Sequence, residues 1–124
     1  MNIALDIDGT IDEHPSFFAT LAQGMRSAGH KIFILTYRDP KRSVATQAQL
    51  AAWNVAYDEL VFSPSLEGKG ELCRQLSIDL FFDDQDECLV GVPQSVIVLK
   101  LRNEGNFDYE EQRWVSTNRL TRLI

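Results

Sequence analysis

The sequence has few basic residues, few cysteines and no apolar run longer than a single strand. Its 12 Lys and Arg residues are outnumbered by 18 Asp and Glu residues, which gives a formal net charge of −6. A general nucleic-acid binder needs a basic surface, so nucleic acid is expected only as a substrate. No run can span a bilayer, and the first ten residues contain aspartates where a secretion signal needs apolar residues. We therefore expect a cytoplasmic protein with no membrane partner.

Cysteine is too scarce for a disulfide framework. Cys73 and Cys88 have neither a CxxC spacing nor the spacing of zinc ligands, so both are predicted to be reduced, packed thiols. The 124 residues suffice for one domain, which we expect to cover residues 1–124. An enzyme of this length has little chain left for a lid or a specificity domain.

Short apolar runs alternate with longer amphipathic ones. The apolar runs are rich in β-branched and aromatic residues, which is typical of parallel strands covered on both faces. The alternation predicts βαβ units with right-handed crossovers. We therefore expect an α/β fold, a three-layer α/β/α sandwich with a Rossmann-like parallel sheet of about five strands. The expected strands are residues 3–7, 31–36, 59–62, 79–83 and 95–101.

Apolar stripes at helical spacing lie between the expected strands and predict helices that face the core. The first helix should begin near Pro15 and stop before Gly29. A short helix over residues 109–122 is expected to pack Trp114 against the sheet. The stripes are Phe17, Leu21 and Met25, with Phe18 and Ala22 beside them; Val44, Ala48, Ala51 and Val55; and Leu72, Cys73 and Leu76.

Polar residues stand at the carboxyl ends of the expected strands, where open α/β sheets bind ligands. Asp6, Asp8, Gly9 and Thr10 close the first strand; Thr36, Tyr37 and Arg38 close the second; Asp83 and Asp84 close the fourth; and Lys69 lies at the start of the third helix.

Buried carboxylates that converge in this way repel one another unless a cation joins them. Lys69 alone does not balance four aspartates, whereas a divalent ion does, and Mg²⁺ prefers carboxylate oxygens. A lone aspartate at a strand end commonly caps a helix or forms a turn, and this interpretation stays open for Asp84 taken by itself. The four acids together favour a magnesium site.

The residues from Asp6 to Thr10 read DxDGT and follow an apolar strand. Thr36, Lys69 and the Asp83-Asp84 pair follow in the order of three further motifs. In these respects the chain resembles the haloacid dehalogenase superfamily, most of whose members are phosphatases. The resemblance covers residues 3 to about 90.

The resemblance implies a role for each of these positions. Asp6 would be the nucleophile that forms an aspartyl-phosphate, and Asp8 the general acid and base. Thr36 would hold phosphoryl oxygens and Lys69 would neutralise charge. The metal would be bound by Asp6, the Asp8 main-chain carbonyl and one of the two motif-four acids, with Asp84 favoured over Asp83.

Four further residues are expected to contact the substrate: Gly9, Thr10, Tyr37 and Arg38. Arg38 is the best candidate for a second phosphate or an anionic leaving group, with a solvated arginine as the open alternative.

The positions at which family members insert a cap domain, residues 11–15 and 63–68, are too short to hold one. The expected function is that of a capless, magnesium-dependent phosphomonoesterase. The phosphate ester is small or macromolecular, and a homo-oligomer can replace the cap. Residues 36–62 resemble nucleotidase-like and polynucleotide 3′-phosphatase-like proteins, and a sugar phosphate is a further option. The alternatives are a receiver-like phospho-acceptor and a non-catalytic phosphate-binding module.

Overall fold

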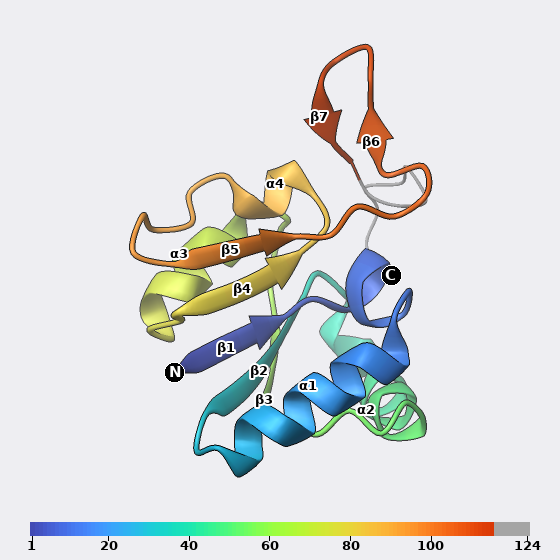
Figure 1. The fold of residues 1–124 in the computed structure, drawn as a ribbon, viewed down its shortest axis with the longest axis vertical. Helices are drawn as coiled ribbons and strands as arrows, with labels where there is room; N and C mark the ends of the chain where they lie inside the picture. Colours follow the sequence, from blue (N-terminus) through green and yellow to red (C-terminus); the bar gives the residue numbers. More distant parts are fainter. Residues whose placement is uncertain (116–124) are drawn as a thin grey trace.

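Five parallel strands form the central sheet of the structure, a computed structural model that describes residues 1–115 (Figure 1). The strand order is β3-β2-β1-β4-β5, and every neighbouring pair is parallel. The α/β fold is the expected one, and β2 and β3 have the predicted bounds. The strands are β1 (Asn2–Leu5), β2 (Lys31–Thr36), β3 (Glu59–Phe62), β4 (Leu80–Asp83) and β5 (Ile97–Lys100).

Helices cover both faces of this sheet and produce three layers. Two of them, α1 (Pro15–Ser27) and α2 (Ser43–Ala52), pack on the face that includes Leu5. The other two, α3 (Gly68–Gln75) and α4 (Asp86–Leu89), pack on the face that includes Ala4. Right-handed crossovers explain the division, because the chain moves outward from β1 to β3 and then returns across the sheet to β4.

The apolar face of α2 differs from the one that we predicted. Val44 is 82% exposed and Ala48 and Ala51 are also exposed, whereas Thr46 and Leu50 are buried. The predicted stripe was therefore wrong, although Val55 beyond the helix is buried as expected. The first helix begins at Pro15 and ends before Gly29, as predicted, with Gly29 at a φ of 94°. Cys73 and Cys88 are buried and free, as predicted.

The predicted helix over residues 109–122 was wrong where the structure describes it. Instead, β6 (Phe107–Asp108) and β7 (Arg113–Trp114) form an antiparallel hairpin. The Asp108 carboxylate accepts hydrogen bonds from the Glu110 and Glu111 amides and fixes a turn. Trp114 packs on Phe107 and under Lys100 of β5. Residues 116–122 of the predicted helix lie outside the described residues.

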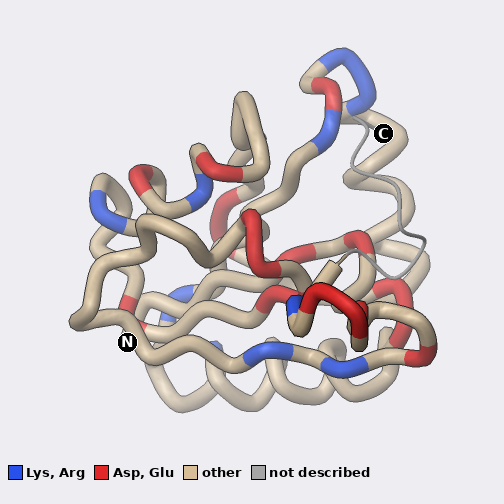
Figure 2. The backbone as a smooth tube through the Cα atoms, turned by 90° about the horizontal axis from the view of Figure 1, so that it is seen from above, with Lys and Arg blue, Asp and Glu red and all other residues tan. Residues whose placement is uncertain are grey.

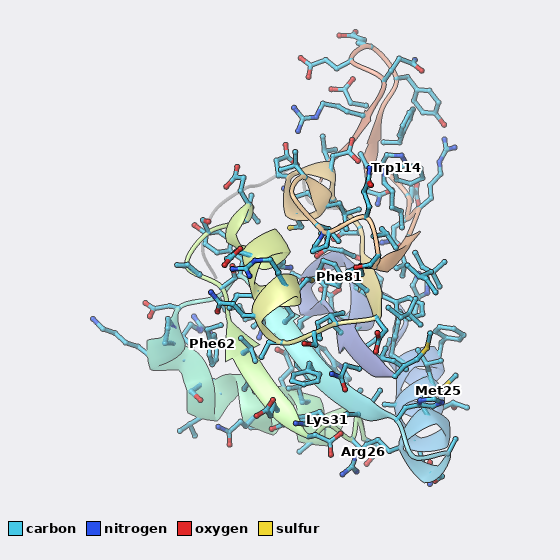
Figure 3. The ribbon with its side chains drawn as sticks, turned by 90° about the vertical axis from the view of Figure 1, so that its left-hand side faces the viewer. Met25, Arg26, Lys31, Phe62, Phe81 and Trp114 are labelled. Carbon is cyan, nitrogen blue, oxygen red and sulfur yellow. The ribbon has the colours of Figure 1, made fainter. Side chains whose placement is uncertain are left out.

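The hairpin extends beyond the carboxyl end of the sheet (Figure 1). Trp114 of the hairpin lies far from Arg26 and Lys31, which are near the amino end of the sheet (Figure 3). The first cap position, residues 11–15, holds only the last residue of η1 (Ile7–Ile11), a single turn interrupted at Asp8 and Gly9, and the link to α1. The second is the short connection from β3 to α3. A second single turn, η2 (Pro40–Arg42), precedes α2. Neither cap position holds a cap domain in the described residues 1–115. No helix in this part of the chain has the length and apolar character needed to cross a membrane.

Candidate active site

Three aspartates meet where two neighbouring strands end. Asp6 follows β1 and Asp83 is the last residue of β4, with Asp84 next to it. All three are buried, and one carboxylate oxygen from each lies within 4.8 Å of the others. The Asp6 amide donates a 3.1 Å hydrogen bond to the Phe82 carbonyl, which extends the β1–β4 pairing by one residue. Acidic segments gather in the middle of the view in Figure 2. The pairing of β1 with β4 thus converts distant motifs into one cluster.

Lys69 supplies a positive charge to this cluster from the first turn of α3. The residue is 1% exposed, and Nζ donates to Asp6 Oδ1 at 2.7 Å and to Asp83 Oδ2 at 2.8 Å. Burial opposes the lysine charge, but the two carboxylates outweigh it and hold the pKa of Lys69 well above 10.5. The structure therefore brings the predicted lysine into the acidic cluster.

Lys69 only partly compensates the negative charge of the three carboxylates. Burial, reinforced by Asp83, raises the pKa of Asp6 to about 7, although Lys69 acts in the opposite direction. Burial and the two neighbouring carboxylates raise the pKa of Asp84 to about 9. Without a further cation, Asp84 retains its proton at neutral pH and Asp6 is about half protonated. A set of carboxylate oxygens that resists ionisation in this way fits a hard divalent cation.

Asp83 and Asp84 differ in the donors that engage them. Asp83 Oδ1 accepts from the amides of Asp84 at 2.7 Å and Gln85 at 3.1 Å, while Oδ2 accepts from Lys69. Asp83 is thus used to fix the backbone and the lysine. Both oxygens of Asp6 are also engaged, since Oδ1 accepts from Lys69 and Oδ2 accepts from Thr10.

The loop after β1 packs against Asp84. Gly9 has a φ of 88°, and a Cβ at this position would lie 2.0 Å from Asp84 Oδ2, so only glycine fits. Thr10 is buried, and its Oγ1 donates to Asp6 Oδ2 at 2.9 Å. Both residues after Asp8 therefore shape the site. Gly9 permits the close approach of the loop to Asp84, and Thr10 orients Asp6.

Thr36 lies at the end of β2 with a fully buried side chain. Its Oγ1 is a buried polar atom without a hydrogen-bond partner within the described part of the chain. Native proteins rarely leave such a hydroxyl unsatisfied, so it fits a ligand oxygen. The neighbouring Tyr37 is half-buried, and among residues 1–115 no hydrogen bond or ion pair joins its side chain to the acidic cluster.

Arg38 is buried rather than solvated, which excludes the alternative considered from the sequence. Its side chain donates from Nε and Nη2 to the two carboxylate oxygens of Asp8, at 2.9 and 2.7 Å. Nη1 donates to Thr46 Oγ1 at 3.3 Å and to Gln49 Oε1 at 2.7 Å. Burial disfavours the guanidinium charge, but Asp8 outweighs this and raises the pKa of Arg38. These contacts explain why α2 turns Thr46 inward and Val44 outward.

Two asparagines outside the four sequence motifs also reach the site. Asn106 is fully buried and donates to the Asp84 carbonyl at 3.2 Å. Asn103 donates to the Gly9 carbonyl at 2.5 Å. Their spacing in the sequence carries no recognisable signal, because both partners are main-chain atoms remote in the chain.

No protein-family model matches the chain, and no curated protein matches it in sequence. Among solved structures, it is similar to a chain from the structure of the Pnkp1/Rnl/Hen1 complex, with a TM-score of 0.65 and 15% sequence identity. The match covers 80% of this chain and 44% of that chain. The protein thus corresponds to less than half of that neighbour, and the likeness shows a shared fold.

Proposed function

We propose that the protein is a magnesium-dependent phosphomonoesterase of the haloacid dehalogenase type that forms an aspartyl-phosphate. The observation that carries this proposal is the cluster of Asp6, Asp83 and Asp84, buried together with Lys69. The cluster combines an anionic nucleophile, a cation and oxygen ligands, and the buried Thr36 hydroxyl supplies a donor for a phosphoryl oxygen.

In the first step, a carboxylate oxygen of Asp6 attacks phosphorus, a new P–O bond forms, and the bond between phosphorus and the ester oxygen breaks. Lys69 stabilises the charge that spreads over the carboxylate and the phosphoryl oxygens. Thr36 donates to one of those oxygens. Thr10 holds Asp6 through its 2.9 Å hydrogen bond, so that the attacking group has a fixed orientation.

Asp8 acts as the general acid in the first step and as the general base in the second. It donates a proton to the departing ester oxygen, which leaves as an alcohol, and then as a carboxylate takes a proton from the water that attacks the aspartyl-phosphate. Inorganic phosphate leaves, and Asp6 is regenerated. Arg38 engages both Asp8 oxygens in this structure and so orients the carboxylate, and one of the two contacts must be released when Asp8 carries the proton.

The residues that would hold Mg²⁺ are Asp6, Asp84 and the main-chain carbonyl of Asp8. When bound, the ion supplies positive charge for the cluster and for the incoming phosphate. Asp83 supports this arrangement through Lys69 and through two backbone amides.

The substrate proposed for this site is a phosphate ester with an unenclosed leaving group. Without a cap, leaving-group selection falls to the loop after β2, which includes Tyr37, and to the surface around it. Nucleotide, polynucleotide 3′-phosphate and sugar-phosphate esters are candidates, small or macromolecular. A second copy of the chain could cover the site in place of a cap, and the reaction itself requires no membrane.

Turnover of an aryl phosphate by the purified protein, with and without Mg²⁺, tests the proposal. Asp6→Asn should abolish turnover, whereas the control Asp79→Asn, which alters an exposed aspartate that accepts from the Asn2 amide, should leave it intact. Undiminished turnover by Asp6→Asn would contradict the covalent route. Stoichiometric labelling by a small phosphodonor without turnover would favour a receiver-like phospho-acceptor. No reaction with a panel of phosphate esters would favour a phosphate-binding module.

A further inference from the structure

The turn that follows β5, residues 101–106, joins the two loops that carry the acidic cluster. We propose that Asn103 and Asn106 are positioning residues that set the distance between the Gly9 loop and the Asp84 loop, and thereby the affinity of the cluster for a divalent cation. This inference rests on the proposed function, because it concerns the same metal site. It adds residues that lie outside all four motifs.

Asn106 anchors the turn from within the protein. Its side chain is fully buried, and Nδ2 donates to the carbonyls of Leu101, at 2.7 Å, and Asp84, at 3.2 Å. Oδ1 accepts from the Asn103 amide at 2.8 Å, and the Asn106 carbonyl accepts from the Val115 amide at 2.9 Å. All hydrogen-bonding atoms of this amide are therefore occupied by main-chain partners. Its contact with the Asp84 carbonyl is the one that reaches the acidic cluster.

Asn103 makes the corresponding contact on the other loop. Its Nδ2 donates to the Gly9 carbonyl at 2.5 Å, and its Oδ1 lies 2.7 Å from Nε2 of His14 at the start of α1. The Asn103 amide is in turn held by Asn106. One short turn thus forms hydrogen bonds to the main chain on both sides of the cluster, at the Gly9 carbonyl and the Asp84 carbonyl.

These two carbonyls lie where the sheet no longer fixes the backbone. Strand β1 ends at Leu5 and β4 at Asp83, so both Gly9 and Asp84 are beyond the ladder. The loops are also at contact distance, since a Cβ on Gly9 would lie 2.0 Å from Asp84 Oδ2. A small separation or shift of the loops therefore changes the spacing between the Asp8 carbonyl and the Asp84 carboxylate. Groups that orient metal ligands commonly change metal affinity about 10- to 100-fold.

If Asn103 and Asn106 only stabilised the fold, their substitution would have a different result. Asn2 is a matched asparagine that distinguishes this stabilising role from the positioning role. Asn2 donates through Nδ2 to the carbonyls of Leu76 and Ser77, at 3.2 and 3.1 Å. It lies at the start of β1, at the opposite end of the strand from the cluster. Asn2→Ala therefore removes the same kind of side-chain-to-carbonyl contact without touching either loop.

The experiment measures binding of Mn²⁺ to the metal-free full chain by loss of the free-ion EPR signal, alongside the melting temperature of each variant. Asn103→Ala should weaken Mn²⁺ binding about 10-fold, with little loss in melting temperature because the residue is half-exposed. Asn106→Ala should weaken binding at least as much, and Asn2→Ala should lower the melting temperature with an unchanged dissociation constant. Turnover of the asparagine variants should recover at saturating cation.

Wild-type affinity in a folded Asn103→Ala variant would overturn the inference, even if Asn106→Ala fails to fold. An equal loss of affinity in Asn2→Ala would overturn it as well, because general destabilisation would then account for the effect. Absence of Mn²⁺ binding in the wild-type protein would overturn the metal site itself. Metal binding without phosphatase turnover would instead contradict the proposed reaction and leave the positioning role supported.

Discussion

Arg38 and Asp8 form a two-pronged ion pair in which Nε and Nη2 of the arginine meet both carboxylate oxygens, at 2.9 and 2.7 Å. Arg38 is only 6% exposed, so this ion pair is fixed by the packing of the fold and is not an incidental surface contact. Thr46 and Gln49 of α2 occupy its third nitrogen. A helix on one face of the sheet therefore orients the proposed acid of the reaction.

The ion pair with Asp8 favours a positioning role for Arg38 over the substrate-binding role predicted from the sequence. Because Arg38 orients Asp8, Arg38→Ala should lower kcat about 10- to 100-fold with a small change in KM. Steady-state kinetics measures the split. A raised KM with an unchanged kcat would instead assign Arg38 to substrate binding. Gln49→Ala, which removes one outer contact of the guanidinium, should have a weaker effect of the same kind.

Removal of Lys69 should destabilise the fold in a pH-dependent way. Lys69→Met leaves the Asp6 and Asp83 carboxylates buried without their cation, and breaking such a pair costs about 3–5 kcal/mol. The loss should be larger near pH 8 than near pH 5, because Asp6 takes up a proton as the pH falls. Urea unfolding at the two pH values measures the difference. The control is Lys31→Met, which breaks an exposed pair with Glu59 and should cost no more than about 1 kcal/mol. A loss independent of pH would argue against the proposed proton uptake.

Gly9 should tolerate no side chain. Gly9→Ala forces a Cβ into the space of Asp84 Oδ2 at a φ of 88°, so we expect a loss of at least about 1–3 kcal/mol and weaker cation binding. Gly24→Ala is the matched control, since this exposed residue of α1 has open space around it. That substitution should stabilise the protein by about 0.5–1 kcal/mol. Thermal unfolding measures both, and a neutral Gly9→Ala would show that the two loops separate freely.

The metal-free protein should lose stability as the pH rises. The pKa values of Asp6 and Asp84, about 7 and about 9 in the folded state, lie above the ordinary value of 3.8. An acid with a raised folded pKa contributes its full stability below pH 3.8 and loses it progressively as the pH rises through the folded pKa. The free energy of unfolding, measured in a chelator between about pH 5 and about pH 9, should therefore fall, and Asp84→Asn should flatten the decline.

Added Mg²⁺ should reverse that decline. Cation binding requires deprotonated ligands, so the rise in melting temperature at millimolar Mg²⁺ should be larger near pH 8 than near pH 5. Differential scanning calorimetry at both pH values is the measurement. A melting temperature that does not change with Mg²⁺ at either pH would contradict a shared metal site.

The sequence by itself determined the sheet, the helices that start at Pro15 and near Lys69, and the residues of the acidic cluster. Hydrophobic runs predict strands that are covered on both faces, and β2 and β3 have the predicted bounds. The expected coverage was wrong for β5, where Ile97 and Leu99 are exposed. Charged residues placed after such runs stand out against an apolar background, so four aspartates were selected from the sequence. The structure brings Asp6, Asp83 and Asp84 together, whereas the Asp8 carboxylate pairs with Arg38. The convergence of these residues follows from the rule for parallel crossovers.

Only the tertiary structure decided how the polar side chains pair. Arg38 turns inward to Asp8 and draws Thr46 with it, which reverses the face of α2 predicted from Val44 and its neighbours. The hairpin after β5 forms in place of the predicted helix, and Asn106 reaches the Asp84 carbonyl. A local pattern records hydrophobic spacing, whereas a buried polar group takes the partner that the packed chain brings within reach, and that partner is often distant in sequence.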